Sequence, residues 1–398
     1  MKRLLLLAVL LLFAAGLCFS ADFGLLVDQT IDADYSLFSY KPALTPWFSW
    51  NGNKGLSLYF SGIFSLEYIK YRDDAAGSSG LVKPAVKPEI SRFALDYRSG
   101  KLISLEAGRV EYSDALGFAA SGLFDGLRFE AALPAGTLNI GAFYTGLLFK
   151  ESAKILMTDD DMRIYSEPWK WGELKPYFAP RRTLASLRWD MPLGETNYLA
   201  AEVLAQFDLS GSGLPLHSQY GEVKLDFFPK TNLGISAGLL LEAMENDGDF
   251  SAAFGFMARI WNDLPTKIND RLSTTIKFSS GAWNDAFSAF APISSVTQGS
   301  IFPGTNAGLA SLSIDYNARF HRTLAADAAL RYFIRSYKDP AGNGSLFGGE
   351  IWASIAWQPL EDIRVSFGGG AFFPRLGNAY PSDTGVMWKI SAGLLLSF

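Results

Sequence analysis

The chain has 398 residues, of which 49% are hydrophobic, 14% aromatic and only 19% charged, with a formal net charge of -5. So much apolar surface excludes a disordered protein, and without a basic excess nucleic-acid binding has little electrostatic support. The only long apolar run is N-terminal, so the chain lacks the repeated runs of about 18 or more apolar residues that a helical membrane protein needs.

The first 20 residues have the features of a signal peptide, because two basic residues precede an apolar segment and small residues follow it. We expect cleavage after Ser20 or Ala21 and export of residues 21–398 as a single domain. The only cysteine, Cys18, lies within this leader. The mature chain is therefore expected to fold without disulfides or thiolate metal sites.

After the leader, apolar and polar residues alternate along most of the sequence. Leu127 and Phe129, for example, share one face of an extended segment, and Arg128 and Glu130 share the other. Period two over ten or more residues is typical of long strands between two environments. The pattern predicts about eighteen strands, or sixteen if the first two segments are not strands: 25–37, 43–50, 55–71, 88–98, 101–111, 123–133, 137–149, 181–191, 196–207, 217–228, 232–244, 249–261, 270–281, 307–319, 323–337, 347–358, 362–373 and 384–398.

The predicted connections alternate between tight turns rich in Gly, Pro and Asn and mostly longer loops, which is typical of outer-membrane barrels. Turns are expected at 51–55, 99–100, 134–136, 192–195, 229–231 and 359–361, and long loops at 72–87, 112–122, 150–180, 209–216, 282–306, 338–346 and 374–383. The sequence thus predicts an all-β fold, an antiparallel up-and-down transmembrane barrel with short periplasmic turns and long extracellular loops. Localisation in the outer membrane follows from this fold.

A soluble β-sandwich also has alternating apolar and polar residues, with its apolar face inward, so alternation alone does not say whether the apolar face meets a protein core or lipid. Aromatic residues gather at both strand ends of the apolar face, which suits the two interfaces of a membrane. A basic residue facing lipid at mid-bilayer costs about 2–4 kcal/mol, so the charged face is expected to line the lumen. The expected girdle next to the short turns is Trp50, Tyr97, Trp189, Phe227, Trp261, Phe320, Trp357 and Phe398, and that next to the long loops is Tyr144, Phe207, Tyr332, Phe373 and Trp388.

The last thirteen residues alternate up to a C-terminal phenylalanine, Phe398. This segment resembles the terminal strand that the barrel-assembly machinery of the outer membrane recognises. The expected partners are therefore this machinery, outer-membrane lipid and small hydrophilic solutes, and a homotrimer is one of two oligomeric states considered, the other being a monomer.

As a whole the chain resembles bacterial outer-membrane porins. The segment from Leu105 to Gly136 has a Gly-Arg pair, an aromatic residue, a loop and then Phe-Asp-Gly-hydrophobe-Arg. In this it is similar to the alginate-export and related substrate-specific porin barrels. The resemblance implies about eighteen strands and passive passage of solutes, sometimes charged sugars.

The inner face is predicted to carry both signs of charge in near balance, which argues against a strong charge filter. Most of these residues are interpreted as a hydrated wall of cross-strand ion pairs. Arg109 interrupts the alternation beside Gly108, which suggests a β-bulge. The candidate pore-lining residues are Arg92, Asp96, Glu106, Arg128, Glu130, Arg182, Arg188, Glu202, Glu222, Lys224, Asp226, Arg259, Lys277, Asp315, Arg319, Arg331 and Arg335.

The long loop 150–180 is the candidate for a segment folded into the lumen, although a solvent-facing loop explains its sequence equally well. Its candidate constriction residues are Asp159, Asp160, Asp161, Trp169, Trp171 and Tyr177. The ligand spacing of a known Ca²⁺ loop is missing, so no metal and no cofactor are expected.

The sequence has no enzyme motif, and its two histidines, His217 and His321, are expected at opposite ends of the barrel. The predicted function is passive diffusion of small hydrophilic solutes through a water-filled lumen, without enzymatic activity. A surface adhesin or structural barrel closed by loops is the alternative, motivated by large loops such as 282–306 that are expected to be exposed. An outer-membrane hydrolase depending on His217 is a third hypothesis.

Overall fold

A computed structural model describes residues 21–52, 55–71, 81–170, 173–211, 215–246, 248–283 and 287–398, and for 81–85 the backbone only. The expected leader lies outside these residues. The eighteen strands are β1 (Ala21–Asp34), β2 (Leu37–Asn51), β3 (Leu56–Tyr71), β4 (Leu81–Ser99), β5 (Ile103–Ser113), β6 (Ser121–Leu133), β7 (Gly136–Tyr144), β8 (Arg182–Leu193), β9 (Asn197–Asp208), β10 (Leu216–Lys230), β11 (Leu233–Asn246), β12 (Asp249–Asp263), β13 (Asn269–Ser279), β14 (Leu309–His321), β15 (Leu324–Arg335), β16 (Leu346–Leu360), β17 (Ile363–Phe373) and β18 (Met387–Ser397).

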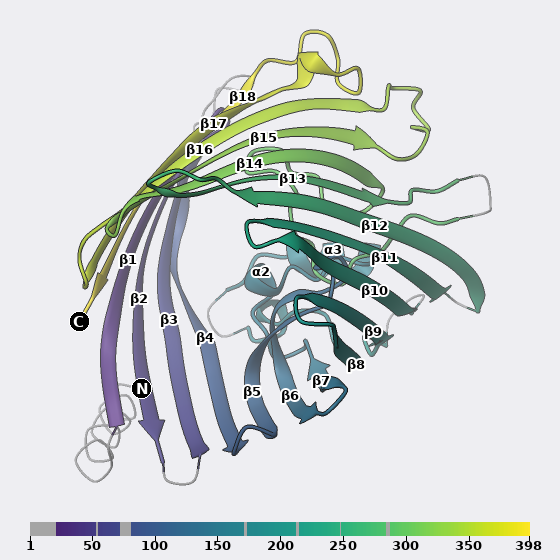
Figure 1. The fold of residues 1–398 in the computed structure, drawn as a ribbon. Helices are drawn as coiled ribbons and strands as arrows, with labels where there is room; N and C mark the ends of the chain where they lie inside the picture. The colour runs from purple at the N-terminus through teal and green to yellow at the C-terminus, as the bar shows by residue number, and fades with distance from the viewer. Residues whose placement is uncertain are drawn as a thin grey trace.

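Every strand pairs antiparallel with its neighbours in sequence, and β1 pairs with both β2 and β18. The sheet therefore closes into an up-and-down barrel (Figure 1). Closure gives every strand a partner on both sides, so the ladder satisfies most of the backbone N–H and C=O groups that lipid cannot satisfy, and the β4–β5 ladder is its shortest part. The predicted fold class and the count of eighteen strands are confirmed.

Several strand boundaries differ from the prediction, with the largest shifts at the starts of β2 and β4 and at the end of β7. β1 ends at Asp34 and β2 already begins at Leu37, although residues 25–37 were expected to form one strand. β4 begins at Leu81 instead of residue 88. The predicted bulge at Arg109 is wrong, because β5 stays in register with β6 through Gly108↔Gly126 and Arg109↔Asp125; Gly108 absorbs the irregularity with a φ of 123°.

Long and short connections lie at opposite ends of the barrel, as predicted. The long-loop end holds connections 114–120, 145–181, 209–215, 280–308, 336–345 and 374–386, and two exceptions, the tight connection 35–36 and the short step from Asn246 to Asp249. Residues 72–80 of the expected loop 72–87 lie outside the described residues. The 145–181 connection contains the helices α2 (Lys150–Ala153) and α3 (Asp159–Ser166) and the 3-10 turn η2 (Lys175–Tyr177), and 374–386 contains η3 (Pro374–Leu376). Both chain ends of the barrel lie at the short-turn end, because Leu26 at the start of β1 pairs with Ser397.

The outer face is a band of large apolar side chains, with exposed fractions such as 57% for Val203, 65% for Leu239 and 50% for Ile355. Most of the expected aromatic girdle falls on this face, and Trp261 is the exception. Its ring lies against Gly234 on the inner face and under the Arg259 guanidinium, 5.6 Å from the ring centroid. Trp261 shares the parity of Arg259, so the alternation itself requires both to point the same way. Within the described part of the chain, no helix is long and apolar enough to cross a membrane.

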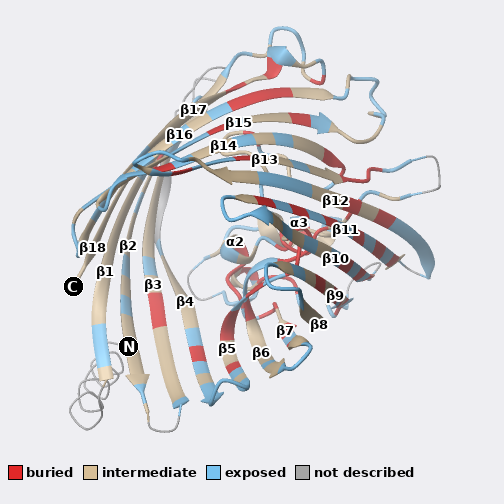
Figure 2. Cartoon of the chain, in the orientation of Figure 1, coloured by how far each residue is buried: buried red, intermediate tan, exposed pale blue. Residues whose placement is uncertain are grey.

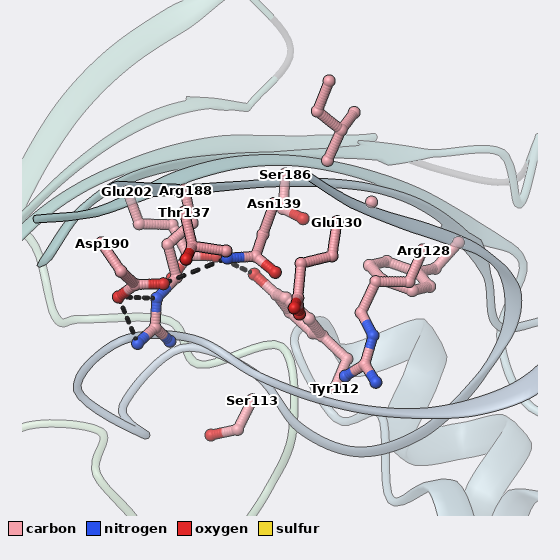
Figure 3. A pocket seen from close by; sticks show the side chains of 13 residues that line it. Tyr112, Ser113, Arg128, Glu130, Thr137, Asn139, Ser186, Arg188, Asp190 and Glu202 are labelled. Atoms are coloured by element: carbon pink, nitrogen blue, oxygen red, sulfur yellow. Dashed lines mark hydrogen bonds and ion pairs between the residues drawn. The ribbon is translucent and has the colours of Figure 1, made fainter. Parts of the chain in front are cut away.

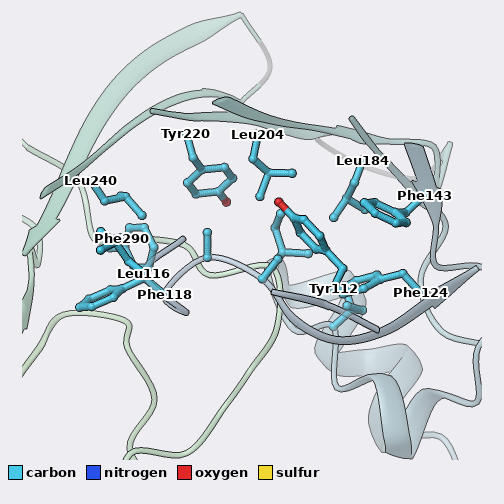
Figure 4. Packing of buried hydrophobic residues seen from close by; sticks show 14 of the residues in the cluster. Tyr112, Leu116, Phe118, Phe124, Phe143, Leu184, Leu204, Tyr220, Leu240 and Phe290 are labelled. Atoms are coloured by element: carbon cyan, nitrogen blue, oxygen red, sulfur yellow. The ribbon is translucent and has the colours of Figure 1, made fainter. Parts of the chain in front are cut away.

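A protein core fills part of the barrel interior (Figure 4). The inner faces of β5–β12 contribute residues such as Leu204, Tyr220 and Leu240, each at most 1% exposed. Connections 114–120, 145–181 and 280–308 contribute the other side, including Ile155 and Phe290. Figure 2 shows the resulting buried positions concentrated on these strands and on the segments inside the barrel. The expectation that 282–306 is an exposed loop is wrong, because Phe290 and Ile293 are 1% and 0% exposed.

Candidate functional site: the inner wall and its infolded loops

The 145–181 connection is held inside the barrel by a buried ion-pair cluster. Arg182, at the start of β8, is 0% exposed and lies 2.6 Å from the Asp161 carboxylate of α3 and 3.3 Å from that of Asp208 on β9. One guanidinium thus joins the loop helix to two wall strands. A buried ion pair broken on one side leaves an uncompensated charge, so this cluster fixes the position of α3. Arg182, a candidate pore-lining residue, lies beneath the loop instead of facing the passage.

The three consecutive aspartates have different roles. Asp161 is 1% exposed and completes a capping box with Thr158, each side chain binding the other residue's backbone N–H at the start of α3. Asp160 pairs with Arg163 at 3.1 Å, and Asp159 is exposed. The arrangement explains the acidic run as a helix N-terminus, where negative charge is favourable. Among the described residues, no group of three His, Cys, Asp or Glu side chains could hold a metal ion.

The aromatic constriction candidates of this loop lie against the wall. Tyr177 stacks on Phe149 with ring centroids 4.7 Å apart, and Trp169 contacts Tyr177 edge-on at 5.7 Å. The Tyr177 hydroxyl donates to the backbone carbonyl of Pro88 on β4 at 2.6 Å. Burial and the nearby Glu89 raise the pKa of Tyr177 to about 12. Trp171 lies outside the described residues.

Three glutamates on adjacent strands bind the backbone of infolded loops. Glu202 on β9 accepts from the Ala115 N–H at 2.7 Å and from the Tyr112 hydroxyl at 2.6 Å. Glu222 on β10 accepts from the Leu116 N–H at 3.1 Å, and Glu242 on β11 from the Ala291 N–H at 3.0 Å. All three are 2–3% exposed. Glu202 and Glu222, predicted to line the pore, therefore sit beneath the loops as acceptors for loop N–H groups.

Glu350 on β16 anchors the 280–308 connection most completely. Its carboxylate accepts from three consecutive N–H groups, those of Ser300, Ile301 and Phe302, at 2.8–2.9 Å. It also pairs with the Arg331 guanidinium at 2.8 Å. The neighbouring Phe302 ring belongs to a second aromatic cluster with Phe333, Phe347 and Phe372. Charge-assisted hydrogen bonds of this kind are about twice as strong as neutral ones, so the loop tip is firmly held.

One cavity of about 330 Å³ lies on the inner wall of β5–β9. Figure 3 shows its lining, in which carboxylate, guanidinium and amide groups surround Tyr112. Arg188 pairs with Asp190 at 2.8 Å, and Asn139 donates to Asp190 at 3.1 Å. The Glu130 side chain is exposed in this cavity, so the wall here offers free acceptor oxygens beside guanidinium groups.

A second cavity of about 510 Å³ lies on the opposite wall, between β12–β15 and residues 296–298. It is lined by hydroxyl and amide groups, three basic residues and one carboxylate, that of Asp315. Arg331 is 3.8 Å from Asp315, whereas Arg259 and Lys277 have no carboxylate within 4.0 Å among the described residues. Lys277 instead donates to the Gln298 side chain at 3.3 Å. This wall therefore presents positive charge to a solute, while the β5–β9 wall is mixed.

The remaining pore-lining candidates mostly pair with each other. Glu106 bridges Arg92 at 3.3 Å and Arg128 at 2.7 Å, so its negative charge is shared by two cations. Lys224 pairs with Asp226 at 3.2 Å. Asp96 lies directly opposite Glu106 in the ladder, Arg319 donates to the Arg322 carbonyl, and Arg335 pairs with Asp339 in the 336–345 connection.

The sequence reasoning missed Glu242 and Glu350 as positioning groups. It also missed Asp114, whose carboxylate accepts from the Phe118 and Ala120 N–H groups at 2.9 and 2.6 Å. A signal for covered wall was present, because β9 and β11 carry large apolar residues on both faces. Leu204, Leu240 and Met244 point inward, and Val203 and Leu239 point outward. A strand that is apolar on both faces is covered on both. The partner segments, however, are far away in sequence, and local periodicity contains no information about them.

The sequence matches no protein-family model and no curated protein. Solved structures share the fold. OccK5 (OpdH) of Pseudomonas aeruginosa matches with a TM-score of 0.61 at 8% identity, covering 95% of this chain and 98% of that chain. OpdK of the same organism, solved with vanillate, matches at 0.60 and 12% identity over 95% and 98%. OprD matches at 0.55 and 10% identity over 95% of both chains.

At such identities the likeness concerns the fold. What this chain shares with them is the fold, which here is a closed barrel of eighteen strands.

Proposed function

We propose that the protein is an outer-membrane channel through which small hydrophilic solutes diffuse passively down their gradients. The observation that carries the proposal is the inner wall, where charged and hydroxyl groups line two cavities on opposite sides. Side chains such as Arg128 and Arg188 remain 42% and 30% exposed inside the barrel, which requires water beside them. Selectivity in this proposal comes from the unpaired Arg259 and Lys277 and from the aromatic constriction residues.

Planar-bilayer recording of refolded protein tests the proposal. We expect discrete conductance steps, and liposome swelling that slows as the sugar becomes larger. Replacing Lys277 and Arg259 by Gln should shift the reversal potential toward cation selectivity at nearly unchanged conductance. A protein that inserts as a folded barrel but gives neither steps nor swelling contradicts the proposal.

The alternative is an adhesin or structural barrel whose lumen is closed by loops. The infolding of 114–120, 145–181 and 280–308 into one core favours it, because these segments occupy part of the interior. It predicts ligand binding at the cell surface with no solute flux, so the swelling experiment separates the two functions.

The hydrolase hypothesis gains no support from the histidines. His217 accepts the Asp208 N–H at 3.1 Å near the long-loop end, and His321 contacts Thr323 at 2.9 Å in a short turn. Neither belongs to the cavities described above.

For assembly we propose that the barrel-assembly machinery of the outer membrane recognises the last strand, β18. The backbone of Phe398 already pairs with that of Leu25 on β1 at 2.9 and 3.0 Å, so the C-terminal residue is part of the closing seam. Removal of Phe398 should slow insertion without changing the conductance of molecules that do insert. Cross-linking in membranes distinguishes a monomer from a trimer.

A further inference from the structure

The seam between β4 and β5 is the least paired in the barrel. Its ladder covers only six residue pairs, from Ala94↔Gly108 to Ser99↔Ile103, although β4 runs on to Leu81 and β5 to Ser113. The next shortest ladder, between β7 and β8, has eight pairs. In Figure 1 the two ribbons meet at the short-turn end and diverge toward the long-loop end.

The sequence of β4 disfavours a longer ladder. Pro84 and Pro88 have no N–H to donate, and proline is confined to strand edges for this reason. An open strand edge in hydrocarbon is costly, because lipid cannot satisfy its polar groups. The unpaired upper half of this seam must therefore be closed by other groups.

Side chains take the place of the missing ladder. The Arg109 guanidinium donates to the Ile90 carbonyl of β4 and, at 3.1 Å, to the Leu147 carbonyl of the 145–181 connection. Arg109 also forms a bidentate pair with Asp125 at 2.8 and 2.9 Å. By alternation both residues belong to the lipid-facing side, yet Arg109 is only 7% exposed. A covered ion pair thus lies within the wall.

The start and end of the 145–181 connection seal the seam from inside. Lys87 pairs with Glu151 at 2.5 Å, Glu89 accepts from Ser152 at 2.8 Å, and Tyr177 donates to the Pro88 carbonyl. These contacts all join the loop to β4, and none is a strand-to-strand bond. Displacing this loop would therefore leave the Arg109–Ile90 bond as the remaining link across the upper half of the seam, with every ladder intact.

The surroundings of the seam are apolar outside and aromatic inside. On the outer side Ile90 and Phe93 are 49% and 44% exposed. On the inner side the stacked pair of Tyr177 and Phe149 faces the same gap. A molecule crossing here would meet apolar surface along its path, with polar groups only at the Arg109 cluster.

We propose that the β4–β5 seam is a lateral portal between the lumen and the outer leaflet for amphipathic molecules with an aromatic or apolar body. In the structure described here the portal is shut by the 145–181 connection. This function is separate from axial diffusion of hydrophilic solutes, because it uses the wall and not the length of the lumen.

The test uses uptake of the fluorescent apolar probe N-phenylnaphthylamine by intact cells that produce the full chain with C18S. Cysteines at the contact between β4 and the loop, E89C with S152C, are joined by a short, reducible bis-thiosulfonate cross-linker. We expect probe uptake to fall to that of cells without the protein and to recover after reduction. The matched control S366C with G393C cross-links two residues that are already paired in the β17–β18 ladder and should leave uptake unchanged.

The portal proposal is overturned if probe uptake is unchanged by the E89C–S152C cross-link. It is also overturned if uptake never exceeds that of cells without the protein. Swelling of liposomes by arabinose is measured on the same variants. Lost swelling with intact, cross-link-sensitive probe uptake would overturn the channel proposal and leave the portal standing.

A second variant opens the seam without a cross-linker. Y177F removes only the hydroxyl that binds Pro88, and we expect faster probe uptake. The heat-dependent shift in gel migration, which reports a folded barrel, should be unchanged. Y332F removes a comparable bond to the Leu376 carbonyl at another loop and should have no effect. Equal uptake in the wild type and Y177F counts against the proposal.

Discussion

The wall formed by β9–β11 and the wall formed by β17, β18 and β1 have the same alternation but use their inner faces differently. On β9–β11 inner residues such as Leu204, Tyr220 and Leu240 are large and at most 1% exposed beneath the loops. On the other wall inner residues such as Ser391 and Gly393 are small, and Asp32 and Lys389 are 26% and 33% exposed, with Phe372 near the end of β17 as a buried exception. The comparison teaches that the inner face of a barrel is a protein core where loops cover it and a wet surface elsewhere.

Acidic residues show the same division. Glu242 is 2% exposed and binds a loop N–H, whereas Asp315, with a side chain 27% exposed, lies 3.8 Å from Arg331 beside a cavity. A carboxylate on the inner face can thus position a loop or contact solvent, and residue type alone does not decide between these roles.

The largest expected effect is that of R182A on the covered wall. Removing this fully buried guanidinium leaves Asp161 and Asp208 uncompensated, which costs about 3–5 kcal/mol. The exposed pair Arg271–Asp263 gives the matched control, since an exposed pair contributes about 0–1 kcal/mol. Urea unfolding in lipid and proteolysis of the 145–181 connection measure the difference, and equal losses for R182A and R271A would refute the distinction between the walls.

The next effect is that of E350A, which removes the acceptor for three loop N–H groups. Hydrogen bonds to charged groups contribute about 1.5–3 kcal/mol, so the 280–308 connection should detach and single-channel conductance should rise. E350Q keeps one acceptor oxygen and should be intermediate. D315A, on the inner face but binding no loop, should change ion selectivity more than conductance. An E350A channel with the conductance of the wild type contradicts a positioning role.

A smaller effect tests whether the two walls differ in the free space next to their inner residues. S218F adds a ring where Ser218 is 0% exposed, and overpacking of this kind costs about 1–3 kcal/mol. S391F places the same ring on the wall without covering loops, where it should leave stability nearly unchanged and reduce conductance. Thermal melts and bilayer recordings of both variants check this. Similar destabilisation by the two substitutions would mean that the second wall is also covered.

The smallest effect is a pH dependence of the loop. The pKa of Tyr177 is raised to about 12 from an ordinary value of about 10. The stability that its hydroxyl adds to the folded loop is therefore fully present below pH 10. It is lost as the pH rises through 12, since the unfolded loop ionises first. Protease sensitivity of the loop should therefore increase between these values, and Y177F should abolish the change. A pH profile unaltered by Y177F would assign the effect to another group.

Much of the fold could be predicted, because alternation is a local property of the chain. The pattern around Leu127 and Arg128, or Leu225 and Lys224, predicts both the strand and its inner face. It failed where local rules compete, as at Trp261, whose aromatic character suggested the lipid interface although its parity with Arg259 places it inside. The candidate site was less predictable, since Asp161 and Arg182 meet only after the loop folds back.

The sequence by itself determined the order of the strands, their number to within two, the faces they turn to lipid, and the placement of both barrel ends at the short turns. These follow from the cost of exposing charge to hydrocarbon and from the period of two residues in a strand. Only the tertiary structure decided which inner residues bind loops, which contact water, and that a side-chain cluster at Arg109 replaces part of the β4–β5 ladder. Such choices depend on contacts between segments that are distant in the chain, and periodicity carries no record of them.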